Sequence, residues 1–325
     1  MPLTEHAVTL DDIRAASARI RSHVAETPLV RDDELSARFG QPVLMKCEYC
    51  QPTEAFKLRG ATNALLCLGK VRGVVTASTG NHGRALAHAA RALGLPATVC
   101  LSRLVPANKV AAVRDLGAEV RITGDSQDAA MAEVARAVAQ ERLTEIPPFD
   151  HADVVAGQGS IGLEIGTPDA VLVPLSGGGL AAGIAVAIKA ISPGTRVIGL
   201  TMENGAAMAT SLRAGRPVEV AEAATLADSL GGGIGLQNHV TFALCRDLLD
   251  QVILLSEAEI AEGIRHLGRQ GHIVEGAAAV GTAALLAGKF TPRGPTVTIL
   301  SGANIDPALH ARIMAGANAV DAVPA

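Results

Sequence analysis

The sequence predicts an α/β protein built on two open, twisted, parallel β-sheets, and two observations support this fold class. Between residues 73 and 143, apolar strand-like segments alternate three times with helical segments, which is the order of right-handed βαβ units. After Pro147 and Pro148, four further segments rich in Val, Ile and Leu recur with helical segments between them. Such continuous apolar runs are typical of parallel strands that helices bury on both faces.

The N-terminal segment is predicted to begin with an amphipathic helix from Asp11 to Val24. Thr9 and Asp12 have the spacing of a capping box at its start. A short helix from Asp32 should end at Gly40, and an apolar strand should follow from Val43 to Cys47. After the turn at residues 51–53, a further helix should start near Phe56 and carry Lys57 in its opening turn.

The remaining strands divide the chain into two predicted domains. The first group of strands lies at residues 73–78, 97–102 and 119–123, with helices that end near Gly94 and at Gly117 and a long helix from Ser126. The second group lies at residues 170–175, 196–201, 251–255 and 296–300. We therefore predict a large domain formed by residues 1–68 and 149–325 and a small α/β domain formed by residues 69–148.

Composition excludes several classes of protein. With 325 residues, 49% of them hydrophobic, the chain can bury a large core. A net charge of -4 gives no reason to expect nucleic acid or an anionic membrane as a partner. The N-terminus does not resemble a signal peptide, and no apolar run reaches the roughly 20 residues of a membrane span. We expect a cytoplasmic protein that acts on a small molecule.

The five cysteines are an odd number, which argues against a secreted disulfide framework. Cys47 and Cys50 form a single C-x-x-C pair without a second pair or a nearby histidine to complete a zinc site. We expect ordinary reduced cysteines.

Lys57 follows a bulky apolar residue at a predicted helix start. Burial there would lower the pKa of its amine and make it a nucleophile toward an aldehyde. Spacing alone favours an ordinary solvated lysine, since most lysines are solvated.

A glycine run follows the strand at residues 170–175 and precedes an Ala-rich helix; it comprises Ser176, Gly177, Gly178, Gly179 and Leu180. Its backbone N–H groups could bind a phosphate at the helix N-terminus, although such a run can also be a tight turn. It has neither the G-K-[ST] of a P-loop nor the spacing of a dinucleotide site.

Two further strand ends carry polar residues. Ser78, Thr79, Gly80, Asn81 and His82 could hold a carboxylate, and Ser301 to Asn304 closes the last strand in the same way. All three loops lie at the carboxyl ends of predicted strands, where open α/β sheets bind ligands.

Together these motifs resemble the fold-type II pyridoxal-phosphate enzymes, which share the architecture of the tryptophan synthase β chain, and among them the threonine dehydratase and serine racemase group. The resemblance runs from Thr27 to Asn304. It implies that pyridoxal 5'-phosphate binds between the two domains as a Schiff base on Lys57, with Phe56 beside its ring. It assigns the phenolic oxygen to Asn81, the phosphate to Ser176 through Leu180, and the pyridine nitrogen to Ser301. It also implies that the substrate carboxylate binds to the loop formed by Ser78, Thr79, Gly80, Asn81 and His82.

The resemblance also implies the reaction. The cofactor serves as an electron sink, and Lys57, freed by the substrate, removes the Cα proton as a general base. Hydroxide leaves from Cβ, and the product becomes a 2-oxo acid and ammonia. The implied partner is an amino-acid substrate, and the implied assembly is a homodimer.

Several positions depart from the common pattern. Ala55 stands where many members have serine, and Thr79 stands where racemases have their second serine, so we expect elimination rather than racemisation. Residues 200–202 and 206–207 lack the oxygen ligands of the relatives that bind a divalent cation, so we expect no metal.

Other departures concern the substrate. Ser229, with the glycines after it, stands where threonine dehydratases commonly have glycine, and Glu275 and Gly276 replace the more usual Glu-Pro. These segments look most like the dehydratases of hydroxyectoine utilisation. We expect Ser229 to place a buried hydroxyl beside the cofactor and to favour a hydroxyectoine-derived amino acid, such as a hydroxy-2,4-diaminobutyrate, over L-threonine.

Other functions stay open at this point. They are a catabolic L-threonine or L-serine dehydratase, an amino-acid racemase, a β-replacing enzyme of the cysteine synthase kind, a nicotinamide dehydrogenase and a non-catalytic pyridoxal-phosphate-binding protein. Because only a short segment follows Ser301, we also expect no response to isoleucine.

Overall fold

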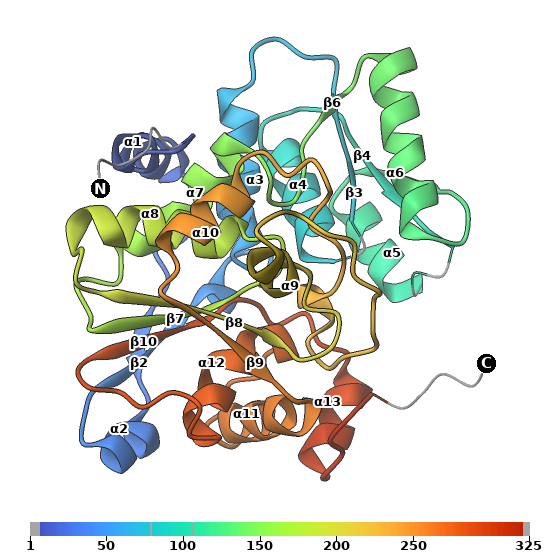
Figure 1. Ribbon diagram of the computed structural model, residues 1–325. Helices are drawn as coiled ribbons and strands as arrows, with labels where there is room; N and C mark the ends of the chain where they lie inside the picture. Colours follow the sequence, from blue (N-terminus) through green and yellow to red (C-terminus); the bar gives the residue numbers. More distant parts are fainter. Residues whose placement is uncertain (1–6, 79, 104, 106, 321–325) are drawn as a thin grey trace.

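The computed structural model describes residues 7–78, 80–103, 105 and 107–320, and it contains two β-sheets (Figure 1). The larger sheet has six strands in the order β1-β2-β10-β7-β8-β9, and the smaller has four in the order β5-β4-β3-β6. Neighbouring strands are parallel except for β1, which runs antiparallel to β2 at the edge of the large sheet. The predicted fold class is confirmed.

The predicted strands are present with nearly the expected bounds, whereas β1 and β6 were not predicted. Both are short, and the three residues of β1 are all exposed, so neither shows an apolar pattern. The strands of the large sheet are β1 (Leu29–Arg31), β2 (Val43–Cys47), β7 (Ala170–Pro174), β8 (Arg196–Met202), β9 (Gln251–Leu255) and β10 (Thr296–Leu300). Those of the small sheet are β3 (Val74–Ala77), β4 (Ala97–Leu101), β5 (Glu119–Ile122) and β6 (Thr144–Glu145).

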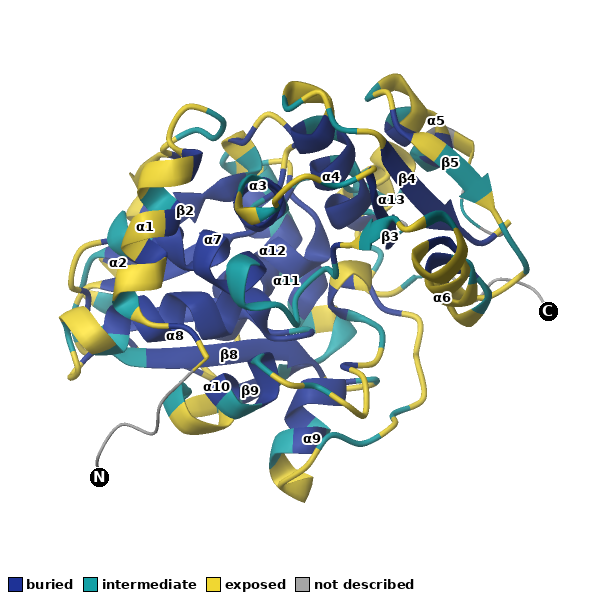
Figure 2. Cartoon of the chain, turned by 90° about the horizontal axis from the view of Figure 1, so that it is seen from above, coloured by how far each residue is buried: buried dark blue, intermediate teal, exposed yellow. Residues whose placement is uncertain are grey.

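Helices cover both faces of the large sheet and bury its central strands (Figure 2). One face packs against α2 (Asp33–Phe39), α11 (Glu257–Arg269), α12 (Gly276–Leu286) and α13 (Pro307–Met314). The other packs against α1 (Leu10–Ile20), α7 (Ala152–Leu163), α8 (Gly179–Ile191), α9 (Ala207–Ala214) and α10 (Thr241–Leu248). All five residues of β7 and of β10 are buried, as the apolar runs predicted.

The first helix is shorter than predicted. The capping box of Thr9 and Asp12 is confirmed, but α1 ends at Ile20 rather than at Val24. The amides of His23 and Val24 both bond to the Ile20 carbonyl oxygen, so the chain turns after Ile20. Val24 then packs against the core of the small sheet, where its apolar side chain is half-buried without further helix.

The small sheet is sandwiched by α4 (Asn81–Ala92) and α5 (Ala107–Asp115) on one side and by α6 (Gln127–Arg136) on the other. A π-helical turn at Ala137–Glu141 extends α6. Helix α3 (Lys57–Cys67) belongs to the same core as α4, and it also packs against α7 of the large sheet. The predicted domain boundaries stay a prediction. No helix in the described part of the chain is both long and apolar enough to cross a membrane.

Candidate active site

The glycine loop joins β7 to α8 at the centre of the large sheet. Gly178 has φ 91° in the left-handed region, where glycine is favoured. A Cβ atom on Gly177 would lie 2.3 Å from the Phe149 ring, so this loop can only be built from glycine. The first N–H groups of α8 have no partner within the helix. Leu180 buries its side chain in the core and can contribute only its backbone, while Ser176 is half-buried.

The start of α10 contacts the glycine loop and fixes its position. The Thr241 hydroxyl donates to the Gly177 carbonyl oxygen at 2.7 Å. The Asp150 carboxylate accepts the backbone N–H groups of His239, Val240 and Thr241 at 2.8 to 2.9 Å, where a negative charge stabilises the start of a helix. The loop is therefore fixed before any ligand binds.

Lys57 is the first residue of α3, as predicted, and its amine lies close to the glycine loop. Lys57 Nζ donates to the Pro148 carbonyl oxygen at 2.6 Å, and the next residue is Phe149, which contacts Gly177. The ammonium also lies 5.2 Å from the centre of the Phe56 ring. Burial lowers the pKa of Lys57 from 10.5 to about 8, and the nearby Glu275 carboxylate opposes that shift. About a tenth of this amine is then neutral at pH 7, far more than for an exposed lysine, and this neutral form is a nucleophile and a base.

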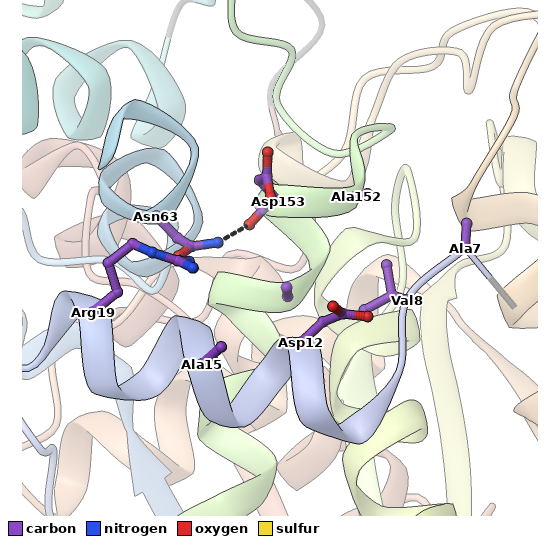
Figure 3. Close-up of a pocket in the computed structure, with 9 residues that line it drawn as sticks. Ala7, Val8, Asp12, Ala15, Arg19, Asn63, Ala152 and Asp153 are labelled. Carbon is purple, nitrogen blue, oxygen red and sulfur yellow. Dashed lines mark hydrogen bonds between the residues drawn. The ribbon is translucent and has the colours of Figure 1, made fainter. Parts of the chain in front are cut away.

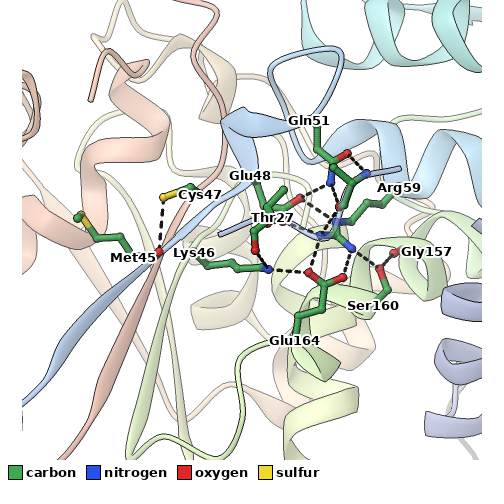
Figure 4. Close-up of polar contacts among 11 residues, drawn as sticks. Thr27, Met45, Lys46, Cys47, Glu48, Gln51, Arg59, Gly157, Ser160 and Glu164 are labelled. Carbon is green, nitrogen blue, oxygen red and sulfur yellow. Dashed lines mark hydrogen bonds and ion pairs between the residues drawn. The ribbon is translucent and has the colours of Figure 1, made fainter. Parts of the chain in front are cut away.

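A buried ionic network anchors the helix that carries Lys57 (Figure 4). Arg59 donates to Glu48 at 2.8 Å and to Glu164 at 2.5 Å, and Lys46 donates to Glu164 at 2.6 Å. Two cations and two carboxylates balance in this network, which is what permits such burial. It connects β2, α3 and α7 and so fixes the direction in which Lys57 projects.

Asn81, which follows β3, meets Glu275 at the start of α12 and Asn304 in the loop after β10. Asn81 Nδ2 donates to both oxygens of Glu275 at 2.9 and 3.2 Å, and the Asn304 amide donates to Asn81 Oδ1. Gly302 lies against both side chains, because a Cβ there would be 2.8 Å from Glu275 Oε1. Ser301 accepts the Phe56 N–H through its carbonyl oxygen at 3.0 Å. Four predicted positions, Phe56, Lys57, Asn81 and Ser301, are thus brought together.

Glu275 is the acidic residue that sequence reasoning missed as a site residue. Its burial raises the pKa of the carboxyl group from 4.5 to about 7, and the charge of Asp228 adds to this, while the Asn81 hydrogen bond opposes it. The sequence showed only a departure from Glu-Pro, without any sign of this burial. The carboxyl group can therefore hold or release a proton at neutral pH.

His82 is held by one of its ring nitrogens, and its role toward a substrate carboxylate stays a prediction. Its Nε2 lies 2.8 Å from the Ile146 carbonyl oxygen, which can only accept, so Nε2 carries the proton. Burial, and then the charge of Lys57, lower the pKa of His82 to about 3. Its Nδ1 is buried without a partner among the described residues. The neighbouring Ser78 accepts the Gly80 N–H at 3.4 Å through its hydroxyl, and Thr79 lies outside the described residues.

The expectation for Ser229 is wrong in one respect. Its hydroxyl is not buried, because Ser229 is exposed in the turn Asp228–Leu230. The hydroxyl is also paired, because it donates to Asp228 Oδ1 at 3.4 Å and its hydrogen bond to Glu275 opposes the raised pKa of that carboxyl group. An unpaired buried hydroxyl therefore cannot explain selection against threonine.

A separate surface hollow lies between α1, α3 and α7 (Figure 3). It holds none of the predicted site residues, and its polar groups pair with one another or with the capping residue Thr9. The Asn63 amide donates to the Asp153 carbonyl oxygen at 2.7 Å, and Arg19 donates to Asn63. We assign this hollow to the packing of the three helices.

Comparison with known proteins identifies the family. Residues 20–302 match the family model of the pyridoxal-phosphate dependent enzymes. The chain is 55% identical over 318 residues to a putative threonine dehydratase of Sinorhizobium fredii, covering 95% of this chain and 96% of that one. It is 40% identical over 310 residues to the catabolic L-threonine dehydratase of Escherichia coli K12, covering 92% and 94%.

Solved structures agree. Maize serine racemase superposes with a TM-score of 0.89 at 32% identity, covering 95% of this chain and 98% of that one. The processed threonine deaminase isoform 2 of Solanum lycopersicum gives 0.88 at 34% identity, covering 95% and 92%. The chain belongs to the pyridoxal-phosphate-dependent enzymes. Within that family it is an ammonia-lyase of the threonine dehydratase type.

The residues present fit pyridoxal 5'-phosphate. The glycine loop leaves a cradle that side chains would fill, and it stands at a helix N-terminus that favours a phosphate. The amine of Lys57 bonds to Pro148, next to the Phe149 ring that contacts Gly177. The Asn81 amide is paired with Glu275, whose charge acts on Lys57. These groups match an aldehyde, a phenolic oxygen and a phosphate in chemistry.

Proposed function

We propose that the enzyme removes water from a hydroxy amino acid whose far end is charged, releasing a 2-oxo acid and ammonia. A hydroxyectoine-derived hydroxy-2,4-diaminobutyrate is the first candidate substrate. The observation that carries this proposal is an ion pair beside the site between Lys109 and Asp228, 3.5 Å apart. The proposal extends the dehydratase activity of the family to a particular class of substrate.

The roles of the residues follow from their surroundings. The cofactor, when bound, supplies an electron sink for the bond changes at Cα and Cβ. Lys57 would hold it, with the Gly177 to Gly179 loop on its phosphate and Asn81 and Ser301 on its ring atoms. The neutral amine of Lys57 then accepts the Cα proton, and the Pro148 carbonyl oxygen holds the resulting ammonium. Glu275, whose pKa is raised to about 7, can hold or release a proton at neutral pH beside Asn81.

Charge beside the site supports a substrate with a charged far end. Lys109 lies on α5, which packs against the small sheet, and Asp228 is the first residue of the turn that contains Ser229. The Asp228 carboxylate is near enough to raise the pKa of Glu275. It can therefore attract an ammonium group at the substrate's far end, whereas the methyl group of threonine gains nothing from it. Lys109 offers the corresponding attraction to the carboxylate of 3-hydroxyaspartate.

The substrate prediction is a ranking of kcat/KM values. The wild type should use a hydroxy-2,4-diaminobutyrate better than 3-hydroxyaspartate or L-threonine. Asp228→Asn should lower kcat/KM for the diamino substrate by up to about 10-fold, which corresponds to roughly 1.4 kcal/mol. Its effect on L-threonine should be smaller, because asparagine keeps the oxygen that accepts the Ser229 N–H and because burial, more than the Asp228 charge, raises the pKa of Glu275. Ammonia release over a range of substrate concentrations measures each value.

Two matched variants complete this test. Ser229→Gly removes a neutral hydroxyl that bonds to Asp228 and Glu275, so it should affect the three substrates alike and leave their ranking unchanged. Lys109→Met should affect 3-hydroxyaspartate most. If L-threonine is the best substrate and Asp228→Asn preserves the ranking, the charged-substrate proposal is wrong.

The second candidate function is that of a catabolic L-threonine or L-serine dehydratase. It is favoured by the names of the relatives at 55% and 40% identity. The same kcat/KM ranking separates the two functions. The homodimer and the cytoplasmic location stay predictions, and sedimentation velocity of the purified enzyme would test the first.

A further inference from the structure

Gln158 presents a buried amide that has no partner. It lies on α7 with 1% of its surface exposed. Neither its oxygen nor its nitrogen has a hydrogen-bond partner among the described residues. Buried side-chain amides are nearly always paired, and an unpaired one destabilises the fold. This side chain therefore needs an explanation outside the packing of the protein alone.

The amide lies between the two elements that frame the cofactor site. A Cβ atom on Gly179, the first residue of α8, would be 2.7 Å from Gln158 Oε1. A Cβ atom on Gly60, three residues after Lys57 in α3, would be 3.0 Å from Gln158 Nε2. Glycine at both positions leaves room for the amide. The Gln158 amide therefore lies beside the N-terminus of α8, and helix N-termini bind anions.

We propose that Gln158 is a cofactor-binding residue whose amide N–H donates to the phosphate group held at the Gly177 to Gly179 loop. An oxygen facing a phosphate would repel it, so Nε2 must turn toward the loop when the cofactor binds. Neither amide atom is paired, so half a turn about the terminal bond breaks no hydrogen bond. This inference rests on the cofactor of the family and is independent of the amino acid that the enzyme uses.

Gln158→Met separates this role from a packing role, because methionine has nearly the same shape and no polar atom. In the cofactor-free full chain the melting temperature should stay the same or rise, since an unpaired buried amide is removed. The Kd for pyridoxal 5'-phosphate should rise about 10- to 100-fold, the range expected for a hydrogen bond to a charged group. The Kd for pyridoxal, which lacks the phosphate, should not change. Absorbance titration measures both Kd values. At the same concentration, inorganic phosphate should raise the melting temperature of Gln158→Met less than that of the wild type.

Two more variants sharpen the comparison. Gln158→Glu keeps the shape but brings a carboxylate toward the phosphate, so its loss of affinity should be the larger. Thr282→Val removes another buried hydroxyl without a partner, on α12. It should have a similar effect on stability without any change in cofactor affinity.

Three results would overturn the proposal. One is an unchanged Kd for pyridoxal 5'-phosphate in Gln158→Met, and another is an equal loss for the phosphorylated and unphosphorylated compounds. The third needs no variant and holds even if the variants fail to fold. It is a crystal structure of the wild-type holoenzyme in which Gln158 Nε2 lies more than about 3.5 Å from every phosphate oxygen.

Discussion

Replacement of Lys57 by alanine should abolish covalent attachment of the cofactor and lower turnover by at least about 10³-fold. One amine serves both as the anchor and as the base, so both functions are lost together. Its surroundings supply the reason, because burial lowers the pKa of Lys57 to about 8 and a carbonyl oxygen holds the amine at 2.6 Å. The visible absorbance of the lysine-bound cofactor and the rate of ammonia release measure the two losses.

The exposed Lys70 provides the matched control, and Lys70→Ala should leave both measurements unchanged. Because folding depresses the pKa of Lys57, its contribution to stability is present above pH 10.5 and is lost as the pH falls through about 8. Lys57→Ala should therefore not destabilise the cofactor-free protein at pH 7. Borohydride reduction followed by peptide mapping shows which lysine carries the cofactor. Cofactor found on another lysine of an active Lys57→Ala variant would disprove the assignment.

The fold could be predicted because its main strands are buried on both faces. The apolar runs at residues 43–47, 251–255 and 296–300 have those same bounds as β2, β9 and β10. The strands that were missed, β1 and β6, have two or three residues and exposed or half-buried side chains. Their pairing partners, rather than their own residues, make them strands. The early end of α1 likewise depends on a turn that the helical pattern does not reveal.

The site could be predicted where function lies in a contiguous motif. The glycine loop and the Lys57 turn were visible in the sequence as short runs of residues. Both lie at the predicted helix starts, at α8 and α3. Glu275 and Gln158 carry no such signal. Glu275 meets Asn81 from 194 positions away along the chain, and only burial raises its pKa. Gln158 stands out because its amide is buried without a partner, which no sequence pattern encodes. Ser229 was misjudged because a substitution in a motif does not reveal whether its side chain is buried.

Glu275→Gln should make the cofactor-free protein more stable than the wild type at pH 8 and equally stable near pH 4. Folding raises the pKa of Glu275 from 4.5 to about 7 by burial. The contribution of this group to stability is therefore fully present below pH 4.5 and is lost as the pH rises through 7. The shift corresponds to roughly 3 kcal/mol of unfolding free energy. Glutamine keeps an oxygen to accept the Asn81 amide hydrogen bond and has no charge to bury.

Urea unfolding at intervals from pH 4 to pH 8 measures this difference, and Glu26→Gln, which changes an exposed carboxylate, provides the baseline. A second effect follows in the same variant, because the Glu275 carboxylate opposes the lowering of the Lys57 pKa by burial. Without that charge the pKa of Lys57 should fall further, so the pH above which cofactor attaches to the lysine should also fall. A stability gain that is the same at pH 4 and at pH 8 would show that Glu275 is ionised throughout. In that case the carboxyl group could not supply a proton to the reaction.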